Sequence, residues 1–401
     1  MNPARRFPLH YAWMIVLSGG LTLFACLGLA RFAFGLLLPA MRQGLALGYD
    51  QMGLISTGNF IGYLLAVALS PWLIRRFRPR AVIFYGLLLV CLCMLFISRA
   101  ENLAMLVIFY GLVGAGSGFA NIPTMVLVSH WFRRNKRGQA AGLIIAGNGL
   151  AIILAGLLVP LLNATYGWRS SWMVLALVSL LAAGVSLLVV RNDPEELGLE
   201  PCGEYEAIAP EEMRGRAGSK ILLQLGIIYL IFGLTYMVYG TFIVTTMVED
   251  FGFSAARAGR LWSWVGFFAL FSGVVFGSIS DRIGRRNGMV LVYGMFSCAY
   301  LLAGLGGHLG PWALWLSVIC YGSVLFAVPT IMAAAVAEYL GLERAASGFS
   351  TLTLFFAAGQ IVGPGSAGLL AEFSHTFVPS YLVCAGLTAV AILLTLRLRV
   401  P

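Results

Sequence analysis

The 401-residue chain is 60% hydrophobic and only 10% charged, and its mean hydropathy is +0.90. A soluble domain is about half apolar and about a quarter charged, so this composition excludes a water-soluble globular protein and indicates a membrane protein. The net charge of +10 is spread between apolar runs, which argues against a nucleic-acid-binding patch. The seven cysteines lack the paired spacing of a zinc site, and we expect neither a metal nor a cofactor.

Twelve apolar runs reach about the 20-residue length that a helix needs to cross a membrane. They lie at residues 11–39, 51–74, 81–99, 103–131, 138–163, 170–190, 221–247, 256–280, 288–306, 311–338, 345–371 and 379–396. The first run exceeds this length, so it can tilt or extend beyond the bilayer. We therefore predict an all-α integral membrane protein with 12 transmembrane helices.

A polar stretch separates the first six runs from the last six. Residues 191–219 read RNDPEELGLEPCGEYEAIAPEEMRGRAGS and contain eight acidic residues. Such a polar, Pro- and Gly-containing composition is typical of a flexible, solvated connector. We predict an N-terminal six-helix bundle over residues 1–190, a cytoplasmic linker over residues 191–219 and a C-terminal six-helix bundle over residues 220–401.

The basic residues between the runs predict the orientation. With the N-terminus inside, 20 of the 26 Lys and Arg residues lie in cytoplasmic segments and five on the opposite side, while Arg31 lies within a span. Loops rich in Lys and Arg remain in the cytoplasm. This predicts a multi-pass protein of a bacterial inner membrane, with both termini and the linker in the cytoplasm.

The second half repeats part of the first at an offset of 206 residues. The stretches GSGFANIPT and GSVLFAVPT contain Gly116 and Gly322 at the same position, and Arg76 corresponds to Arg282 in the same register. The matches run from the second predicted span to the fifth without a shift. Six plus six helices in parallel repeat is the arrangement of large transporters whose halves rock about a binding site near the bilayer midplane.

The loop between predicted spans 8 and 9, GSISDRIGRRNG (residues 277–288), resembles the signature loop of the major facilitator superfamily. The resemblance implies a cytoplasmic gate that the loop aspartate helps to hold. It assigns to the gating loops the residues Asp281, Arg282, Gly284, Arg285, Arg286 and, in the first half, Arg76. The first-half loop, SPWLIRRFRPR, departs from the pattern, because Arg75 stands at the Asp position and Arg78 at the Gly position.

Shorter stretches are similar to bacterial monocarboxylate and oxalate–formate porters. They are HYAWMIV near the N-terminus, WFRRNKRGQAAG (131–142), GWRSSW (167–172) and DPEELGLEP at the start of the linker. The stretch GLARFAFGLLLP (28–39) is also similar to a bacterial branch that carries an arginine in its first helix. The resemblance implies a small organic acid, in particular a monocarboxylate, as the substrate.

Arg31 is the one charged residue well inside a predicted span, with seven or eight apolar residues between it and the next loop. A charged residue at this depth costs several kcal/mol and is functional by default. None of the sixteen acidic residues falls near the middle of a span. A guanidinium binds a carboxylate through two hydrogen bonds, so we predict an anion site at Arg31. A snorkelling arginine or an inter-helix hydrogen bond is the alternative, and Arg260 is either a second anion site or a surface residue.

Eight other polar residues fall at mid-span depth, on spans that line the cavity in the superfamily that the chain resembles. They are Asn59, Tyr63, Asn121, Asn148, Tyr236, Tyr239, Tyr321 and Gln360. We predict that they contact the substrate together with Arg31. Each residue taken singly could instead hold helices together by hydrogen bonds.

These observations predict a secondary transporter that moves a small organic anion by alternating access. A multidrug efflux transporter of the same fold is the first alternative, and a transporter-like receptor is the second. An enzyme is disfavoured because no nucleophile–base or metal constellation is visible in the sequence. We expect a monomer in the lipid bilayer that binds no nucleic acid, and a coupled proton is compatible with the sequence.

Overall fold

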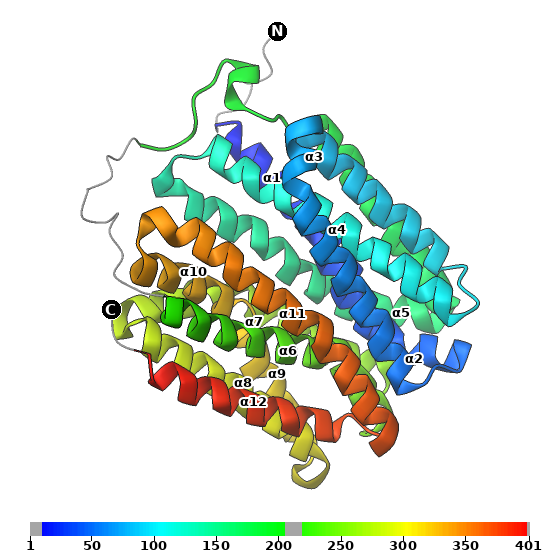
Figure 1. The fold of residues 1–401 in the computed structure, drawn as a ribbon. Helices are drawn as coiled ribbons and strands as arrows, with labels where there is room; N and C mark the ends of the chain where they lie inside the picture. The colour runs from blue at the N-terminus through cyan, green and yellow to red at the C-terminus, as the bar shows by residue number, and fades with distance from the viewer. Residues whose placement is uncertain (1–9, 205–218, 399–401) are drawn as a thin grey trace. The chain divides into compact units, whose positions relative to one another are not determined.

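The computed structural model describes residues 10–204 and 219–398, and within these ranges the chain is helical (Figure 1). The helices are α1 (Ala12–Leu23), the π-helix η2 (Phe24–Phe32), α2 (Ala33–Leu45), α3 (Tyr49–Ile97), α4 (Leu103–Trp131), α5 (Arg134–Val189), the 3-10 helix η3 (Pro194–Leu197), α6 (Ser219–Glu249), α7 (Ala255–Ile283), α8 (Arg285–Leu309), α9 (Pro311–Val324), α10 (Ala327–Leu340), α11 (Leu342–Ser374) and α12 (Val378–Leu396). The described residues contain one isolated β-bridge, between Phe132 and Cys202.

Twelve membrane spans are present in the described residues. Ten helices there are long and apolar enough to cross a membrane. Two of them, α3 and α5, contain 49 and 56 residues, which at 1.5 Å per residue is more than twice the roughly 30 Å of a bilayer core. Each is interrupted by one residue with a non-helical backbone, Arg78 in α3 and Gly167 in α5, and therefore contains two spans. The predicted all-α fold with twelve spans is confirmed.

The chain divides into two compact units. The first holds the chain up to Ala40 and from Gly58 through the start of the connector, and the second holds Met41–Thr57 and the helices from α6 onward. In the first unit α1 and η2 pack on α4 and α5, and in the second α6 packs on α11 while α8 packs on α9 and α12. Residues 41–57 thus belong by contact to the second unit, although their place in the sequence is within the predicted N-terminal bundle.

Ion pairs and hydrogen bonds attach residues 41–57 to the rest of the second unit. Arg42 pairs with Glu249 at 2.7 Å, and the Tyr49 hydroxyl donates to the same carboxylate oxygen at 2.9 Å. The Tyr49 backbone N–H donates to the Glu372 carboxylate at 2.8 Å. Burial raises the pKa of the adjacent Asp250 carboxyl; the Thr376 hydroxyl, which donates to it, acts in the opposite direction. Glu249 and Glu372 therefore have structural partners at the helix ends.

Glycine allows the helices of the first unit to approach closely. A side chain at Gly62 in α3 would overlap the backbone oxygen of Gly111 in α4, and one at Gly114 would overlap the backbone of Asn59. Small residues at such contacts are the usual means of association between membrane helices. The glycine run in α4 is therefore a packing surface, and it fixes the α3 residues next to Arg31.

The repeat is visible in these contacts. A Cβ at Gly116 would lie 2.7 Å from the backbone oxygen of Gly86, and a Cβ at the equivalent Gly322 would lie 2.9 Å from the backbone oxygen of Val265. The same position of the repeat therefore allows a close helix approach in each unit, but the neighbouring helices differ, because Gly86 lies in the second half of α3 and Val265 lies in α7, the equivalent of the first half.

Candidate functional site

The segment that carries Arg31 is a π-helix rather than an α-helix. Two side chains of α4 hydrogen-bond to its backbone carbonyl groups: Ser117 donates to Cys26 at 2.5 Å, and the Tyr110 hydroxyl donates to Ala30 at 3.3 Å. A π segment contains one residue more per turn than its surroundings and occurs frequently at functional sites. The local structure of η2 thus sets the direction in which Arg31 leaves the helix.

Arg31 is buried in the first unit, with 9% of its surface exposed. Its guanidinium carbon lies 4.8 Å from the centre of the Phe60 ring and 4.7 Å from the centre of the Tyr63 ring. Aromatic faces attract a cation most strongly where water is excluded. These two rings therefore hold the guanidinium in place without neutralising its charge.

The hydrogen-bonding capacity of Arg31 is not satisfied by the protein. Its Nε and Nη2 atoms are buried and have no hydrogen-bond partner among the described residues. No described carboxylate forms an ion pair with it. Buried charged groups are normally paired, and an unpaired polar group in a native structure calls for an explanation. The arrangement fits an anion that completes the site.

Two predicted site residues are connected to Arg31 through its aromatic neighbours. Asn121 donates to the Tyr63 hydroxyl at 2.8 Å, and Asn59 donates to the backbone carbonyl of Tyr110 at 2.9 Å. The Asn59 Oδ1 atom is buried and has no partner in the described chain. The structure thus joins Arg31, Asn59, Tyr63 and Asn121 into one polar cluster.

Asn148 of α5 also lies against the same π segment. Its backbone packs against Gly28 of η2, and its buried Oδ1 atom has no partner in the described protein. Gly28 is three residues before Arg31, so along the axis of η2 Asn148 lies within about one helical turn of Arg31. Unpaired donors on Arg31 and an unpaired acceptor on Asn148 are thus present in one region of the first unit.

The four predicted site residues of the second unit form their own cluster. Gln360 hydrogen-bonds to the Tyr236 hydroxyl, the Tyr321 hydroxyl donates to the Tyr236 backbone carbonyl at 2.7 Å, and Tyr239 stacks on Tyr321 with ring centres 4.1 Å apart. The Tyr239 hydroxyl also lies 2.9 Å from the Ser317 hydroxyl. Tyr239 and Tyr321 are fully buried and use their hydroxyls within the unit, which is the behaviour expected of helix-joining residues.

Phe60 and Tyr110 contribute to the site but were not selected from the sequence. Phe60 covers one face of Arg31, and Tyr110 links the backbone of η2 to Asn59. In the sequence both are single aromatic residues in apolar runs. The spacing of Asn59, Phe60 and Tyr63 on one helix could have indicated Phe60, because residues three and four apart share a helix face.

The signature loop of the second unit forms a compact ion-pair network. Arg285 pairs with Asp281 within the loop and with Glu338 of α10 at 2.7 Å, and it donates to the Ser280 hydroxyl at 2.8 Å. Gly284 has a φ of 87°, a conformation that suits glycine. Arg282 is exposed and Arg286 partly buried. The network joins the loop between α7 and α8 to the end of α10.

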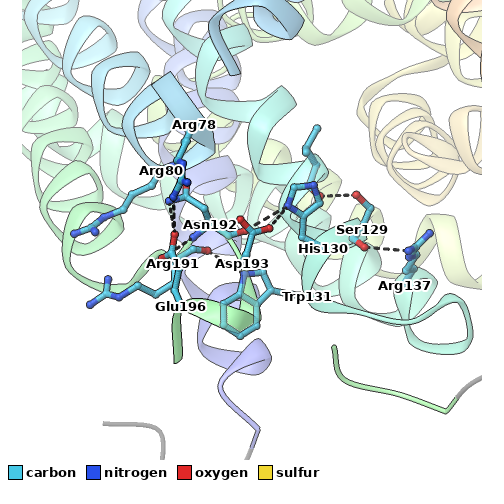
Figure 2. A network of polar contacts seen from close by, with 11 residues as sticks. Arg78, Arg80, Ser129, His130, Trp131, Arg137, Arg191, Asn192, Asp193 and Glu196 are labelled. Atoms are coloured by element: carbon cyan, nitrogen blue, oxygen red, sulfur yellow. Dashed lines mark hydrogen bonds and ion pairs between the residues drawn. The ribbon is translucent and has the colours of Figure 1, made fainter. Parts of the chain in front are cut away.

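The corresponding loop of the first unit lacks this network. Arg78 occupies the position of Gly284 and also has a positive φ, 64°, while Arg76 is exposed with its guanidinium carbon 5.9 Å from the Phe77 ring centre. Figure 2 shows that Arg78 and Arg80 instead approach the segment that follows α5. Residues 191–204 belong to the predicted connector, and in the structure they contact the first unit.

A groove of about 670 Å³ opens between α1 and α5 of the first unit. Its lining is apolar and includes Trp13, Leu17, Phe24, Leu143 and Leu150. Arg31 is not among the lining residues, so this groove offers no charged partner to an anion.

Comparison with known proteins agrees with the architecture. The family model described as Major Facilitator Superfamily matches residues 20–323 and 225–401. Among curated proteins, the chain is 23% identical over 390 residues to "Hexuronate transporter" of Bacillus subtilis (strain 168), covering 93% of this chain and 91% of that protein. It is 24% identical over 404 residues to "Putative tartrate transporter" of Agrobacterium vitis, covering 92% and 86%.

Solved structures give the same fold. A bacterial homolog of the human lysosomal transporter Spinster, in an inward-facing and unoccupied conformation, aligns with a TM-score of 0.75 at 15% identity. The alignment covers 96% of each chain. At this identity the likeness concerns the fold alone. The similar proteins are transporters rather than enzymes.

Proposed function

Because the chain belongs to the Major Facilitator Superfamily, we propose that it is a secondary transporter that carries a small organic anion, a monocarboxylate, across the membrane by alternating access. Two similar proteins are named as a hexuronate transporter and a putative tartrate transporter. Hexuronate and tartrate are acids, and this supports the anionic class of the cargo. The finer resemblance to monocarboxylate and oxalate–formate porters supports the single carboxylate. The loops rich in Arg and Lys, and both termini, face the cytoplasm in this proposal.

The buried Arg31, with two unpaired nitrogen atoms between two aromatic rings, carries the proposal. One guanidinium binds one carboxylate through two hydrogen bonds. The neighbouring groups of the first unit are amides and phenols, so a second negative charge would have no cation to pair with there. In our proposal Asn59, Tyr63, Asn121 and Asn148 supply the neutral contacts beside Arg31. Tyr236, Tyr239, Tyr321 and Gln360 of the second unit also stay predicted substrate contacts.

Uptake into proteoliposomes that contain the purified full-length chain tests the proposal. The panel contains labelled acetate, lactate, glucuronate and tartrate, with glucose and choline as neutral and cationic controls. We expect uptake of monocarboxylates above that of protein-free vesicles, and none of glucose or choline. Uptake of choline, or uptake of glucose without that of any acid, would contradict an anion transporter.

An amphiphile efflux transporter is the second candidate, and the apolar groove between α1 and α5 is the observation in its favour. Cells that overproduce the chain would then resist several unrelated amphiphilic compounds. We expect no such protection. Resistance that persists in an Arg31→Ala variant would favour efflux over acid transport.

The signature loop provides a further prediction. We expect Asp281→Asn to lower the transport rate several-fold, because Arg285 then loses one of its two carboxylate partners at the end of α7. Arg75→Ala should have a smaller effect, since Arg75 is exposed and outside any described ion pair. Initial uptake rates at equal protein density measure both. The reverse order would refute the assignment of the gate to the second-unit loop.

A further inference from the structure

The two units hold equivalent loops by different means. In the second unit Asp281, Arg285 and Glu338 connect the loop between α7 and α8 to the end of α10. At the repeat offset of 206 residues these positions become Arg75, Pro79 and Phe132. An arginine, a proline and a phenylalanine cannot form this network, so the first-unit loop requires another support.

The segment after α5 contacts this loop directly, as Figure 2 shows. We call residues 191–202 the strap. The Asn192 Oδ1 atom accepts a hydrogen bond from the Arg80 backbone N–H at 2.9 Å, and its Nδ2 atom donates to Glu196 at 2.9 Å. Glu196 in turn lies 3.4 Å from the Arg78 guanidinium. Asn192 is 8% exposed and both of its hydrogen bonds are partly buried, so they carry more weight than the exposed Arg78 pair.

The strap also contacts the end of α4. The Trp131 indole N–H donates to the Arg191 carbonyl at 2.9 Å, and His130 Nδ1 lies 2.8 Å from an Asp193 carboxylate oxygen. The Cys202 backbone N–H donates to the Trp131 carbonyl at 2.9 Å, and the Cys202 carbonyl accepts from the Arg133 backbone N–H at 2.9 Å. These contacts lie next to Phe132, which in the repeat corresponds to Glu338 at the end of α10 in the second unit.

The backbone of the loop shows why support is needed. Arg78 has φ 64° and ψ 157°, a conformation close to that of Gly284, with φ 87° and ψ 149°. This conformation is strained for a residue that has a Cβ atom, and such a residue adopts it only where contacts with the surrounding structure hold it there. The hydrogen bond from Asn192 is made to Arg80, two residues after Arg78. The strap thus fixes the strained turn.

We propose that the strap is a working part of the first unit: Asn192 positions the turn at Arg78 against the end of α4, in place of the ion-pair network of the second unit. The strap fastens the two halves of α3, the end of α4 and the end of α5 to one another. The first unit therefore moves as one body during a conformational cycle. In this role Asn192 is a positioning residue and contacts no substrate.

The rate at which the native Cys202 thiol is labelled measures how often the strap detaches from α4. Cys202 is 9% exposed and paired by its backbone to α4. In the purified full-length protein we expect Asn192→Ala to raise the rate of maleimide labelling at Cys202, read by peptide mass spectrometry, by about tenfold or more, because loss of one buried hydrogen-bond partner favours local opening by about this factor. Asn287→Ala, which removes an exposed asparagine from the second-unit loop, should leave the rate unchanged. An unchanged rate in folded Asn192→Ala protein would overturn the proposal.

A double-mutant cycle tests the strained turn separately. Arg78→Gly supplies the residue that the second unit uses, so the turn no longer depends on Asn192. We expect Asn192→Ala to lower the Tm less in the Arg78→Gly background than in the natural chain, since coupled positions are non-additive. Equal Tm decreases in both backgrounds would show that Asn192 does not act on the turn.

Transport gives the functional readout, and this part alone rests on the proposed function. Asn192→Ala should lower the maximal uptake rate several-fold and leave the KM unchanged, whereas Arg31→Ala acts on the binding site. A raised KM with an unchanged maximal rate would contradict a positioning role. If no acid is carried, the proposed function fails, while the labelling rate and the double-mutant cycle still decide on the strap.

Discussion

Arg31→Ala is expected to lower acid uptake about 100-fold, because removal of one member of a buried charge pair costs about 2–5 kcal/mol. Arg31→Lys keeps the charge and loses the planar pair of donors, so we expect a loss of about tenfold. Initial uptake rates in proteoliposomes, over a range of concentrations of the acid that is carried best, measure both effects. The exposed Arg260 offers a matched control, and Arg260→Ala should transport normally.

The stability of the same variants distinguishes a binding site from a structural arginine. Nε and Nη2 of Arg31 have no partner in the described protein, so replacing the residue removes a buried charge without breaking a pair. We expect the Tm of Arg31→Ala protein, without substrate, to be unchanged or higher. A fall of several degrees together with normal uptake would instead assign Arg31 to helix packing.

Gly62→Ala is expected to destabilise the first unit by about 1–3 kcal/mol, because the added methyl group overlaps the backbone oxygen of Gly111 and forces α3 away from α4. The Tm in detergent should fall by several degrees. Asn59, Phe60 and Tyr63 lie on the same stretch of α3, so acid uptake should fall as well.

Gly142→Ala is the matched control for this prediction. A Cβ atom at Gly142 in α5 would meet nothing within 4 Å, and alanine is the better helix former by about 1 kcal/mol. We therefore expect its Tm to be unchanged or slightly higher. If the two variants had equal Tm values, the close approach of α3 and α4 would not contribute to the stability of the unit.

The membrane makes the fold of this chain predictable. Without water in the bilayer, each backbone polar group must be satisfied within the span, which leaves helices as the solution for apolar runs of this length. The prediction of twelve spans is therefore confirmed, although two pairs of adjoining spans follow each other within α3 and α5, with a single non-helical residue between them. Gly116 was identified as a position of the repeat, and in the structure it allows a close helix approach.

The sequence indicated the polar members of the candidate site more readily than the apolar ones. Arg31 stands out in the sequence because a charge in lipid is costly. Of the two aromatic rings that hold it, Tyr63 was predicted because it is a polar residue at mid-span depth, whereas Phe60 does not stand out, since aromatic residues are common in apolar runs. From the sequence, Tyr239 and Asn148 are equally good candidates for a substrate contact, because both are polar residues at mid-span depth. In the structure the Tyr239 hydroxyl pairs with Ser317, whereas the Asn148 Oδ1 atom has no partner in the described protein.

The connector shows the limit of composition most clearly. Its acidic residues, proline and glycine are typical of a solvated linker. Composition gives the residue types, but it does not give the residues that they contact in the folded chain. Asn192 becomes a structural residue only because the Arg80 backbone and Glu196 lie within hydrogen-bond distance of it. No local pattern encodes a contact between positions 112 residues apart.

The sequence by itself determined the membrane class, the number of spans, the repeat and the single buried charge, because each follows from local hydrophobicity or from register along the chain. Tertiary structure alone decided that Arg31 leaves a π segment between two rings with its Nε and Nη2 atoms unpaired in the described protein, and that the strap replaces the missing ion pairs of the first-unit loop. These features depend on which hydrogen-bonding groups find partners once distant helices pack together. That outcome is a property of the folded chain.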